Sequence, residues 1–167
     1  MGSLPDCIAL RLDEQLRAAL PDVLGPQDGG DLVLGYGQLT AMGAGNTISS
    51  HVDSPKYGEV IVTVGLVGGV QVTLALKHKP VDSFSGVEIL AGHAYAIFGY
   101  ARHRLSHEVW CPPTSILSPE CRIDAYGGRA KGARVPARVG LTLRYFRRSF
   151  CELGLGPARV PPRHVGS

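Results

Sequence analysis

The sequence predicts a mainly β protein, a sandwich or a barrel, with a short helix near its N-terminus. Its 167 residues include 22 glycines and 12 prolines, which favour many turns and short strands over long helices. Residues 60–66 and 70–76 alternate apolar side chains with small or polar ones, which is the period of a strand. Further segments of strand character follow at short spacing: Val87–Leu90, Ala94–Phe98, Leu105–Val109 and Arg138–Tyr145. Many short strands with almost no helix after residue 25 indicate packed or closed sheets.

Proline and glycine mark the ends of the elements before and between these strands. We expect an amphipathic helix over Asp13–Leu20, with Asp13 as its N-cap and Pro21 as its stop. Residues 25–30 form a turn-rich linker before the first strand. The two alternating segments are joined by Val67-Gly68-Gly69, which is a hairpin signal.

By length the chain holds one domain with a substantial core. We expect an N-terminal helix and linker over residues 1–30, the folded domain over 31–150, and a tail containing proline and arginine over 151–167. Hydrophobic content of 44% with 19% charged residues is typical of a globular protein. No apolar run reaches the roughly 18 residues that span a bilayer, and the N-terminus lacks signal-peptide features. We therefore expect a monomeric intracellular protein of the nucleus or cytoplasm, without a membrane partner.

The four cysteines lie far apart and form no CxxC pair, which argues against a zinc site or a dense disulfide framework. They are expected to be reduced thiols: Cys7, Cys111, Cys121 and Cys151.

Charge is unevenly distributed along the chain. Residues 1–100 carry five Lys/Arg against ten Asp/Glu, whereas residues 101–167 carry twelve against four. A basic C-terminal half is suited to contacts with nucleic-acid phosphates. The alternative is that basic residues such as those of 159–163 are simply solvated.

The segment Arg138–Tyr145 has one apolar and one polar face. Period-two alternation places one set of side chains on the first face, namely Val139, Leu141, Leu143 and Tyr145. Arg138, Gly140, Thr142 and Arg144 share the other face, and its two arginines lie about 20 Å apart along the strand. This pattern suits a barrel whose polar interior holds an anion, because arginine pairs bidentately with carboxylates. The alternative is an exposed strand with its arginines in water.

His51 and Asp53 are two positions apart, so in an extended segment both point from one face toward a common ion. Two imidazoles and one carboxylate can occupy one face of octahedral Fe(II) and leave positions open for a cosubstrate and O₂. The second imidazole is His103 or His107. These histidines are four positions apart within a predicted strand, so spacing alone leaves both open.

Three segments resemble the AlkB family of Fe(II)/2-oxoglutarate dioxygenases. His51-Val-Asp53-Ser-Pro-Lys-Tyr-Gly, with the Val-Thr-Val-Gly-Leu that follows, resembles the family's metal-binding strand and the next strand. Ala101-Arg-His-Arg-Leu-Ser-His107 resembles the segment with the distal histidine, which selects His107 over His103. Arg138-Val-Gly-Leu-Thr-Leu-Arg144 resembles the RxxxxxR signature. Together these matches cover roughly residues 32–148.

The resemblance implies a double-stranded β-helix, a jelly-roll or cupin-like barrel with iron at one mouth. His51, Asp53 and His107 would bind Fe(II), and Arg138 would pair with the distal carboxylate of the cosubstrate 2-oxoglutarate. Arg144 would lie nearer the metal-side carboxylate or the substrate. The implied activity is oxidative demethylation of N-alkylated DNA or RNA, with release of succinate, CO₂ and formaldehyde.

The chain departs from the family around the cosubstrate. An upstream Asn-x-Tyr that contacts 2-oxoglutarate in many members falls at Thr40 and Met42. Tyr36 or Tyr95 could substitute, and Thr142 shares the polar face between the two arginines. A reduced set of cofactor contacts motivates one alternative, a weakly active scaffold that binds nucleic acid.

The chain also departs from the family around the substrate. Pro55 replaces an acidic residue that helps to read the base, and an Asn found in some members is Gly140. Base flipping needs an aromatic or apolar wall, and the single tryptophan, Trp110, is as well suited to a core position. The second alternative is therefore the same chemistry on a protein or a small molecule.

Overall fold

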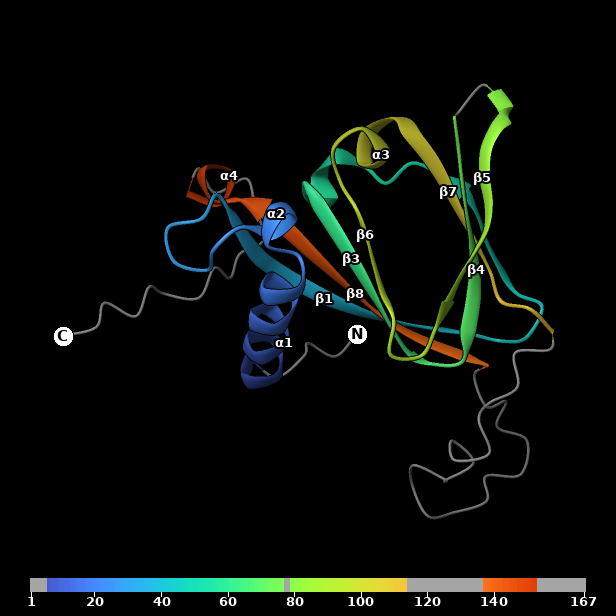
Figure 1. Cartoon of the computed structure of the whole chain (residues 1–167), viewed down its shortest axis with the longest axis horizontal. Helices are drawn as coiled ribbons and strands as arrows, with labels where there is room; N and C mark the ends of the chain where they lie inside the picture. Colours follow the sequence, from blue (N-terminus) through green and yellow to red (C-terminus); the bar gives the residue numbers. More distant parts are fainter. Residues whose placement is uncertain (1–5, 77–78, 114–136, 153–167) are drawn as a thin grey trace, which may run out of the picture.

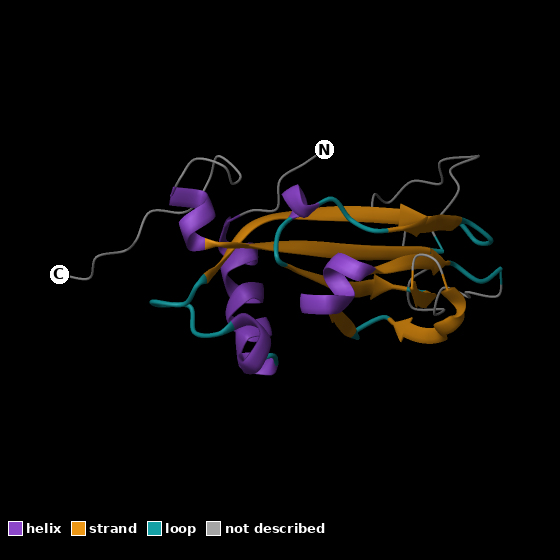
Figure 2. Cartoon of the chain, turned by 90° about the horizontal axis from the view of Figure 1, so that it is seen from above, coloured by secondary structure: helices purple, strands orange, loops and turns teal. Residues whose placement is uncertain are grey.

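The structure is a computed structural model that describes residues 6–76, 79–113 and 137–152. Helical segments are short after the first: α1 (Asp6–Ala19), α2 (Pro21–Leu24), the 3₁₀ turn η1 (Pro55–Tyr57), α3 (Gly99–Arg104) and α4 (Arg148–Glu152). Strands make up the body of the protein (Figure 2): β1 (Leu32–Met42), β2 (Thr47–His51), β3 (Val60–Val67), β4 (Gly69–Leu76), β5 (Lys79–Leu90), β6 (Ala94–Ile97), β7 (Leu105–Trp110) and β8 (Arg138–Arg147).

The strands form two four-stranded sheets, with the orders β1-β8-β3-β6 and β2-β7-β4-β5. Every pairing within them is antiparallel. Strands that follow one another in the sequence mostly lie in different sheets, so the chain crosses repeatedly between the two layers (Figure 1). The mainly β architecture predicted from the sequence is confirmed.

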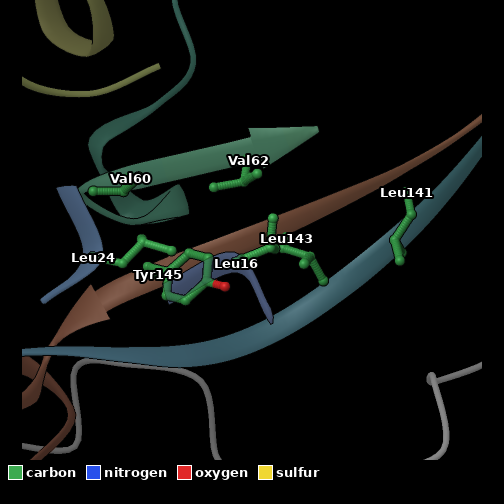
Figure 3. Close-up of a cluster of buried hydrophobic side chains, with 7 residues drawn as sticks. All are labelled: Leu16, Leu24, Val60, Val62, Leu141, Leu143 and Tyr145. Carbon is green, nitrogen blue, oxygen red and sulfur yellow. The ribbon is translucent and has the colours of Figure 1, made fainter. Parts of the chain in front are cut away.

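The first sheet buries its outer face beneath the N-terminal helices. Seven buried side chains from α1, α2, β3 and β8 meet there (Figure 3): Leu16, Leu24, Val60, Val62, Leu141, Leu143 and Tyr145. Leu141, Leu143 and Tyr145 are the apolar face that alternation predicted for β8. Burial of this face against α1 forces the opposite face of β8 toward the second sheet, because successive side chains of a strand point in opposite directions.

The space between the sheets is apolar at one end. A second buried cluster joins β4, β5 and β7 to the ends of β1 and β8: Met42, Val70, Val72, Ile89, Val109, Cys111 and Ala137. The polar face of β8 begins beside this cluster at Arg138 and runs past it to Arg144. Arg138 and Arg144 are 3% and 8% exposed, so the alternative of an exposed strand with these two arginines in water is wrong.

Two local predictions need correction. The N-terminal helix begins at Asp6 rather than at Asp13, and Asp13 pairs with Arg17 one turn later instead of capping. The helix does end before Pro21, where α2 begins. Residues 67–69 do not join a hairpin, because β3 pairs with β6 and β8 whereas β4 pairs with β5 and β7. Gly68, with φ of 66° and no room for a Cβ beside the carbonyl of Ala137, turns the chain from one sheet into the other.

A third correction concerns the segment before His107. Residues 102–104, expected to extend the strand, form the last turn of α3, and β7 begins only at Leu105. His103 is therefore helical, which removes the premise that it shares a strand face with His107.

Several sequence predictions concern residues outside the described ranges. Cys121 and most of the basic tail fall in 114–136 and 153–167. Cys111 and Cys151 are free thiols. Within the described residues, no helix is long and apolar enough to cross a membrane.

Candidate metal centre and anion site

His51, Asp53 and His107 converge at one end of the second sheet. His51 is the last residue of β2 and lies opposite His107 of β7 in the antiparallel register. Asp53 follows two residues later. One nitrogen or oxygen from each of the three side chains lies within 4.8 Å of the others, close enough to hold one metal ion. The carboxylate lies between the rings, because Asp53 Oδ1 is 3.7 Å from His51 Nε2 and Asp53 Oδ2 is 3.7 Å from His107 Nε2.

The orientation of the His51 ring and the protonation of His107 suit a metal ion. Nδ1 of His51 lies 2.8 Å from the carbonyl oxygen of Ser49 and donates to it, so Nε2 is the ring nitrogen that faces Asp53. Burial, with a smaller effect from neighbouring His51, lowers the pKa of His107 to about 4. His107 is therefore neutral near pH 7, the form that binds metals. Two imidazoles and a carboxylate fit Fe(II) or a similar divalent ion.

The structure distinguishes His107 from His103. His103 is 41% exposed on α3, and its Nε2 is 3.5 Å from Glu59 Oε2. It does not join the three converging side chains. The geometry thus agrees with the choice of His107, which spacing alone had left open.

Arg144 lies beside the candidate metal centre. Its guanidinium is 4.6 Å from the ring centroid of Tyr57 and 5.8 Å from that of Tyr36, and its Nη1 is 3.9 Å from Asp53 Oδ2. Tyr36 pairs with Arg144 across β1 and β8, which explains the contact. Among the described residues, Nε and Nη1 of Arg144 find no hydrogen-bond partner. Two buried donors in this position are suited to an anion at the metal.

Arg138 lies deeper, beside the apolar cluster between the sheets. Its Nη1 is 3.5 Å from the Sδ of Met42, a weak acceptor, and its Nε has no hydrogen-bond partner within the described ranges. No acidic side chain of those ranges pairs with it. Burial lowers the pKa of this guanidinium, with Tyr95 opposing the shift. A buried cation without a carboxylate costs stability, so the site is suited to a bound carboxylate.

Glycine at position 140 makes room for this arginine. A Cβ on Gly140 would lie 2.7 Å from Cζ of Arg138, so the guanidinium of Arg138 folds over Gly140 on the same strand. The absence of an asparagine side chain here, noted in the sequence, thus has a structural consequence. Any larger residue would displace the cation.

Hydroxyl groups lie between the two arginines. Thr142 and Thr63 face each other across β8 and β3, with their Oγ1 atoms 3.2 Å apart. The hydroxyl of Tyr95 hydrogen-bonds to Thr63, while burial raises the pKa of Tyr95. These hydroxyl groups are suited to donate hydrogen bonds to the oxygens of a dicarboxylate bound between the arginines.

Two residues of the site escaped sequence reasoning. Tyr57, in η1, packs on Arg144, and the only available signal was an aromatic residue four positions after Asp53. Arg102, on α3, is 2% exposed and donates to the carbonyl oxygens of Asp53 and Ser54. Nothing in the local sequence separates Arg102 from its exposed neighbour Arg104.

Comparison with known proteins supports the fold. No protein-family model and no curated protein matches the chain. A Burkholderia pseudomallei oxidoreductase of the 2OG-Fe(II) oxygenase family is similar in structure, with a TM-score of 0.53 and 18% identity. The match covers 87% of this chain, which spans only 58% of that protein. Such a likeness shows the fold, and the double-stranded β-helix that was predicted is confirmed.

A second similar structure carries no weight. The match to Drosophila melanogaster CENP-C bound to CAL1 has a TM-score of 0.35 at 6% identity, over 73% of this chain and 68% of that one.

Proposed function

We propose that this protein is an Fe(II)/2-oxoglutarate-dependent dioxygenase of the AlkB type. The observation that carries the proposal is the occurrence, inside one β-helix, of a His-Asp-His group and two buried guanidiniums with donors that have no hydrogen-bond partner among the described residues. A metal site alone fits many proteins. Two cations facing into the same interior add the requirement for an organic anion, and a dicarboxylate satisfies both of them.

The residues have separate tasks in this proposal. His51, Asp53 and His107 hold Fe(II), and Arg138 pairs with the distal carboxylate of 2-oxoglutarate. Arg144 orients the carboxylate at the metal, and the packing of Tyr57 on its guanidinium fixes the position of that cation. The bound Fe(II) and 2-oxoglutarate together supply activation of O₂ and two-electron oxidation of a substrate C–H bond, with release of succinate and CO₂.

We propose N-alkylated nucleic acid, DNA or RNA, as the substrate. The excess of basic residues in the C-terminal half supports binding of phosphates. Tyr36 and Tyr57 lie against Arg144, which neighbours Asp53, and they offer aromatic rings on which an extruded base can stack. Hydroxylation of an N-methyl group gives a hemiaminal that loses formaldehyde and leaves the N–H base.

The first test is succinate formation from 2-oxoglutarate. We expect turnover that requires Fe(II), disappears in Asp53→Ala and persists in Asp28→Ala, which removes an exposed carboxylate from the turn before β1. Equal activity of wild type and Asp53→Ala would refute the proposal.

A second test addresses the substrate. Formaldehyde release from an oligonucleotide with a single N-methylated base, and tighter binding at low salt, would support nucleic acid. Succinate formation that the oligonucleotide does not affect would instead favour a protein or a small molecule as the substrate. Pro55, which replaces an acidic base-reading residue, is the observation that favours this alternative.

A further inference from the structure

Arg102 is a fully buried cation that no metal or anion role explains. It lies on α3 with 2% of its surface exposed, and it is the largest fully buried side chain among the residues that the structure describes. Each arm of its guanidinium has its own backbone acceptor. Nη1 donates to the carbonyl of Asp53 at 2.7 Å, Nη2 to that of Ser54 at 2.7 Å, and Nε to that of Gly58 at 3.1 Å.

These three carbonyls belong to the segment that follows the first metal-binding histidine. His51 and His107 are held by the ladder between β2 and β7. Asp53 lies beyond the end of β2, and β3 begins only at Val60. The segment between contains the short turn η1, whose own bonds join Tyr57 to Ser54 and Gly58 to Pro55. The sheet therefore fixes the two imidazoles but not the carboxylate.

Arg102 connects this segment to the strand of the other histidine. It lies five positions before His107 in a continuous stretch of chain, so its hydrogen bonds tie the backbone of Asp53 to the start of β7. A planar fork with separate donors can serve three carbonyls at once, whereas a lysine ammonium is a single point. The exposed pair His103–Glu59 adds a weaker link between the same two segments, at 3.5 Å.

We propose that Arg102 is a positioning residue that sets the place of the Asp53 carboxylate relative to the two histidines. This rests on the metal centre of the proposed function and assigns Arg102 no contact with substrate or cofactor. Mutation of a residue that orients a metal ligand typically lowers metal affinity by a factor of about 10–100. We expect a loss of metal affinity in this range when Arg102 is replaced.

The test compares Arg102→Lys and Arg102→Gln with wild type and with a matched control, Arg104→Gln. Arg104 is exposed on the same helix, two positions away. Co(II) serves as a spectroscopic probe of the metal site, titrated without 2-oxoglutarate. We expect about 10–100-fold weaker Co(II) binding in both Arg102 variants, with altered Co(II) d–d bands, and less than a twofold change in Arg104→Gln.

Hydrogen exchange of the metal-free proteins gives a second readout. The amides of Tyr57 and Gly58 should exchange faster in Arg102→Lys than in wild type, while those in the centre of β8 keep their protection. This comparison separates a local effect on the segment from general unfolding. If Arg102→Gln does not fold, Arg102→Lys, which keeps the charge, decides the matter.

The outcomes separate the two proposals. If wild type and Arg102→Lys bind Co(II) equally well, only the positioning role of Arg102 is overturned. If wild type binds Co(II) but makes no succinate, the proposed function is overturned. The Co(II) titrations of the Arg102 variants then still decide the positioning role. Failure of wild type to bind Co(II) overturns both.

Discussion

Replacement of Arg138 by methionine should make the protein more stable and less able to bind a dicarboxylate. Methionine is unbranched, fills much of the same space and suits the neighbours Met42 and Cys111. The substitution removes a guanidinium that is 3% exposed and whose Nε has no partner in the described ranges. An orphaned buried donor costs about 1–3 kcal/mol, so the metal-free variant should gain stability of about that size.

The same substitution should weaken 2-oxoglutarate binding. A charge-assisted hydrogen bond contributes about 1.5–3 kcal/mol, so loss of a two-bond pairing with the distal carboxylate costs about 3 kcal/mol or more. A cost of about 3 kcal/mol corresponds to a fall in affinity of roughly 150-fold. The two effects have opposite signs, and a merely damaged core would lower both stability and affinity.

Calorimetric titration of the Co(II)-loaded protein without oxygen measures this effect. The ligands are 2-oxoglutarate and 2-oxobutyrate, a 2-keto acid without the distal carboxylate. Wild type should prefer 2-oxoglutarate by about two orders of magnitude, and Arg138→Met should bind both ligands with similar weak affinity. Arg147→Met, on the same strand but with a side chain that is 66% exposed, is the control. A preference that survives in Arg138→Met would refute the pairing of Arg138 with the distal carboxylate.

Three further predictions concern the groups around the site. Gly140→Ala should displace the guanidinium of Arg138 and weaken 2-oxoglutarate binding by about tenfold, the worth of one charge-assisted bond. Gly43→Ala should not, because its Cβ would make only ordinary van der Waals contact with the side chain of Asn46. Because the pKa of His107 falls from 6.5 to about 4 on folding, the unfolded chain binds more protons between these values. The metal-free protein should therefore lose stability on the order of 3 kcal/mol as pH falls from 6.5 to 4, and thermal melts of His107→Phe should lack this slope. Leu143→Ala should cost about 2–5 kcal/mol in urea unfolding without changing Co(II) affinity, since Leu143 lies on the outer face of β8; unchanged stability would contradict the packing described.

The part of the site that could be predicted rests on local periodicity. Alternation along β8 places Arg138 and Arg144 on one face whatever the strand pairs with. The sequence alone therefore predicts that the two arginines point the same way. Strand pairing is different, because it depends on residues far apart in the chain. Val67-Gly68-Gly69 has hairpin composition, yet Gly68 meets the carbonyl of Ala137 and turns the chain into the other sheet.

The choice between the two histidines shows the same limit. One turn of helix at α3 separates them, and six residues give too little periodicity to predict that helix against a strand. Arg102 and Tyr57 escaped prediction for a related reason. Arg102 donates to backbone carbonyls of another segment, and Tyr57 packs on the guanidinium of Arg144. Neither contact can be predicted from the residues adjacent in sequence.

The balance of buried charge links the two halves of the site. The buried guanidiniums of Arg102, Arg138 and Arg144 lie in or beside the interior. The carboxylate of Asp53 lies 3.9 Å from Nη1 of Arg144, and its charge opposes the fall in the pKa of Arg102 that burial causes. A divalent metal ion adds positive charge to a region that already has an excess. A dianion should therefore bind more tightly once the metal is present, and the metal more tightly once the dianion is present.

Glutarate isolates this electrostatic coupling, because it has both carboxylates but no keto oxygen to chelate the metal. We expect Co(II) to strengthen glutarate binding by about 5–150-fold, and glutarate to strengthen Co(II) binding by the same factor, as linkage requires. Calorimetric titrations in the two orders measure both factors. Arg144→Met should make glutarate binding weaker at every metal concentration. Glutarate affinity that is the same with Co(II) and with a chelator would mean that the buried cations and the metal centre do not act as one site.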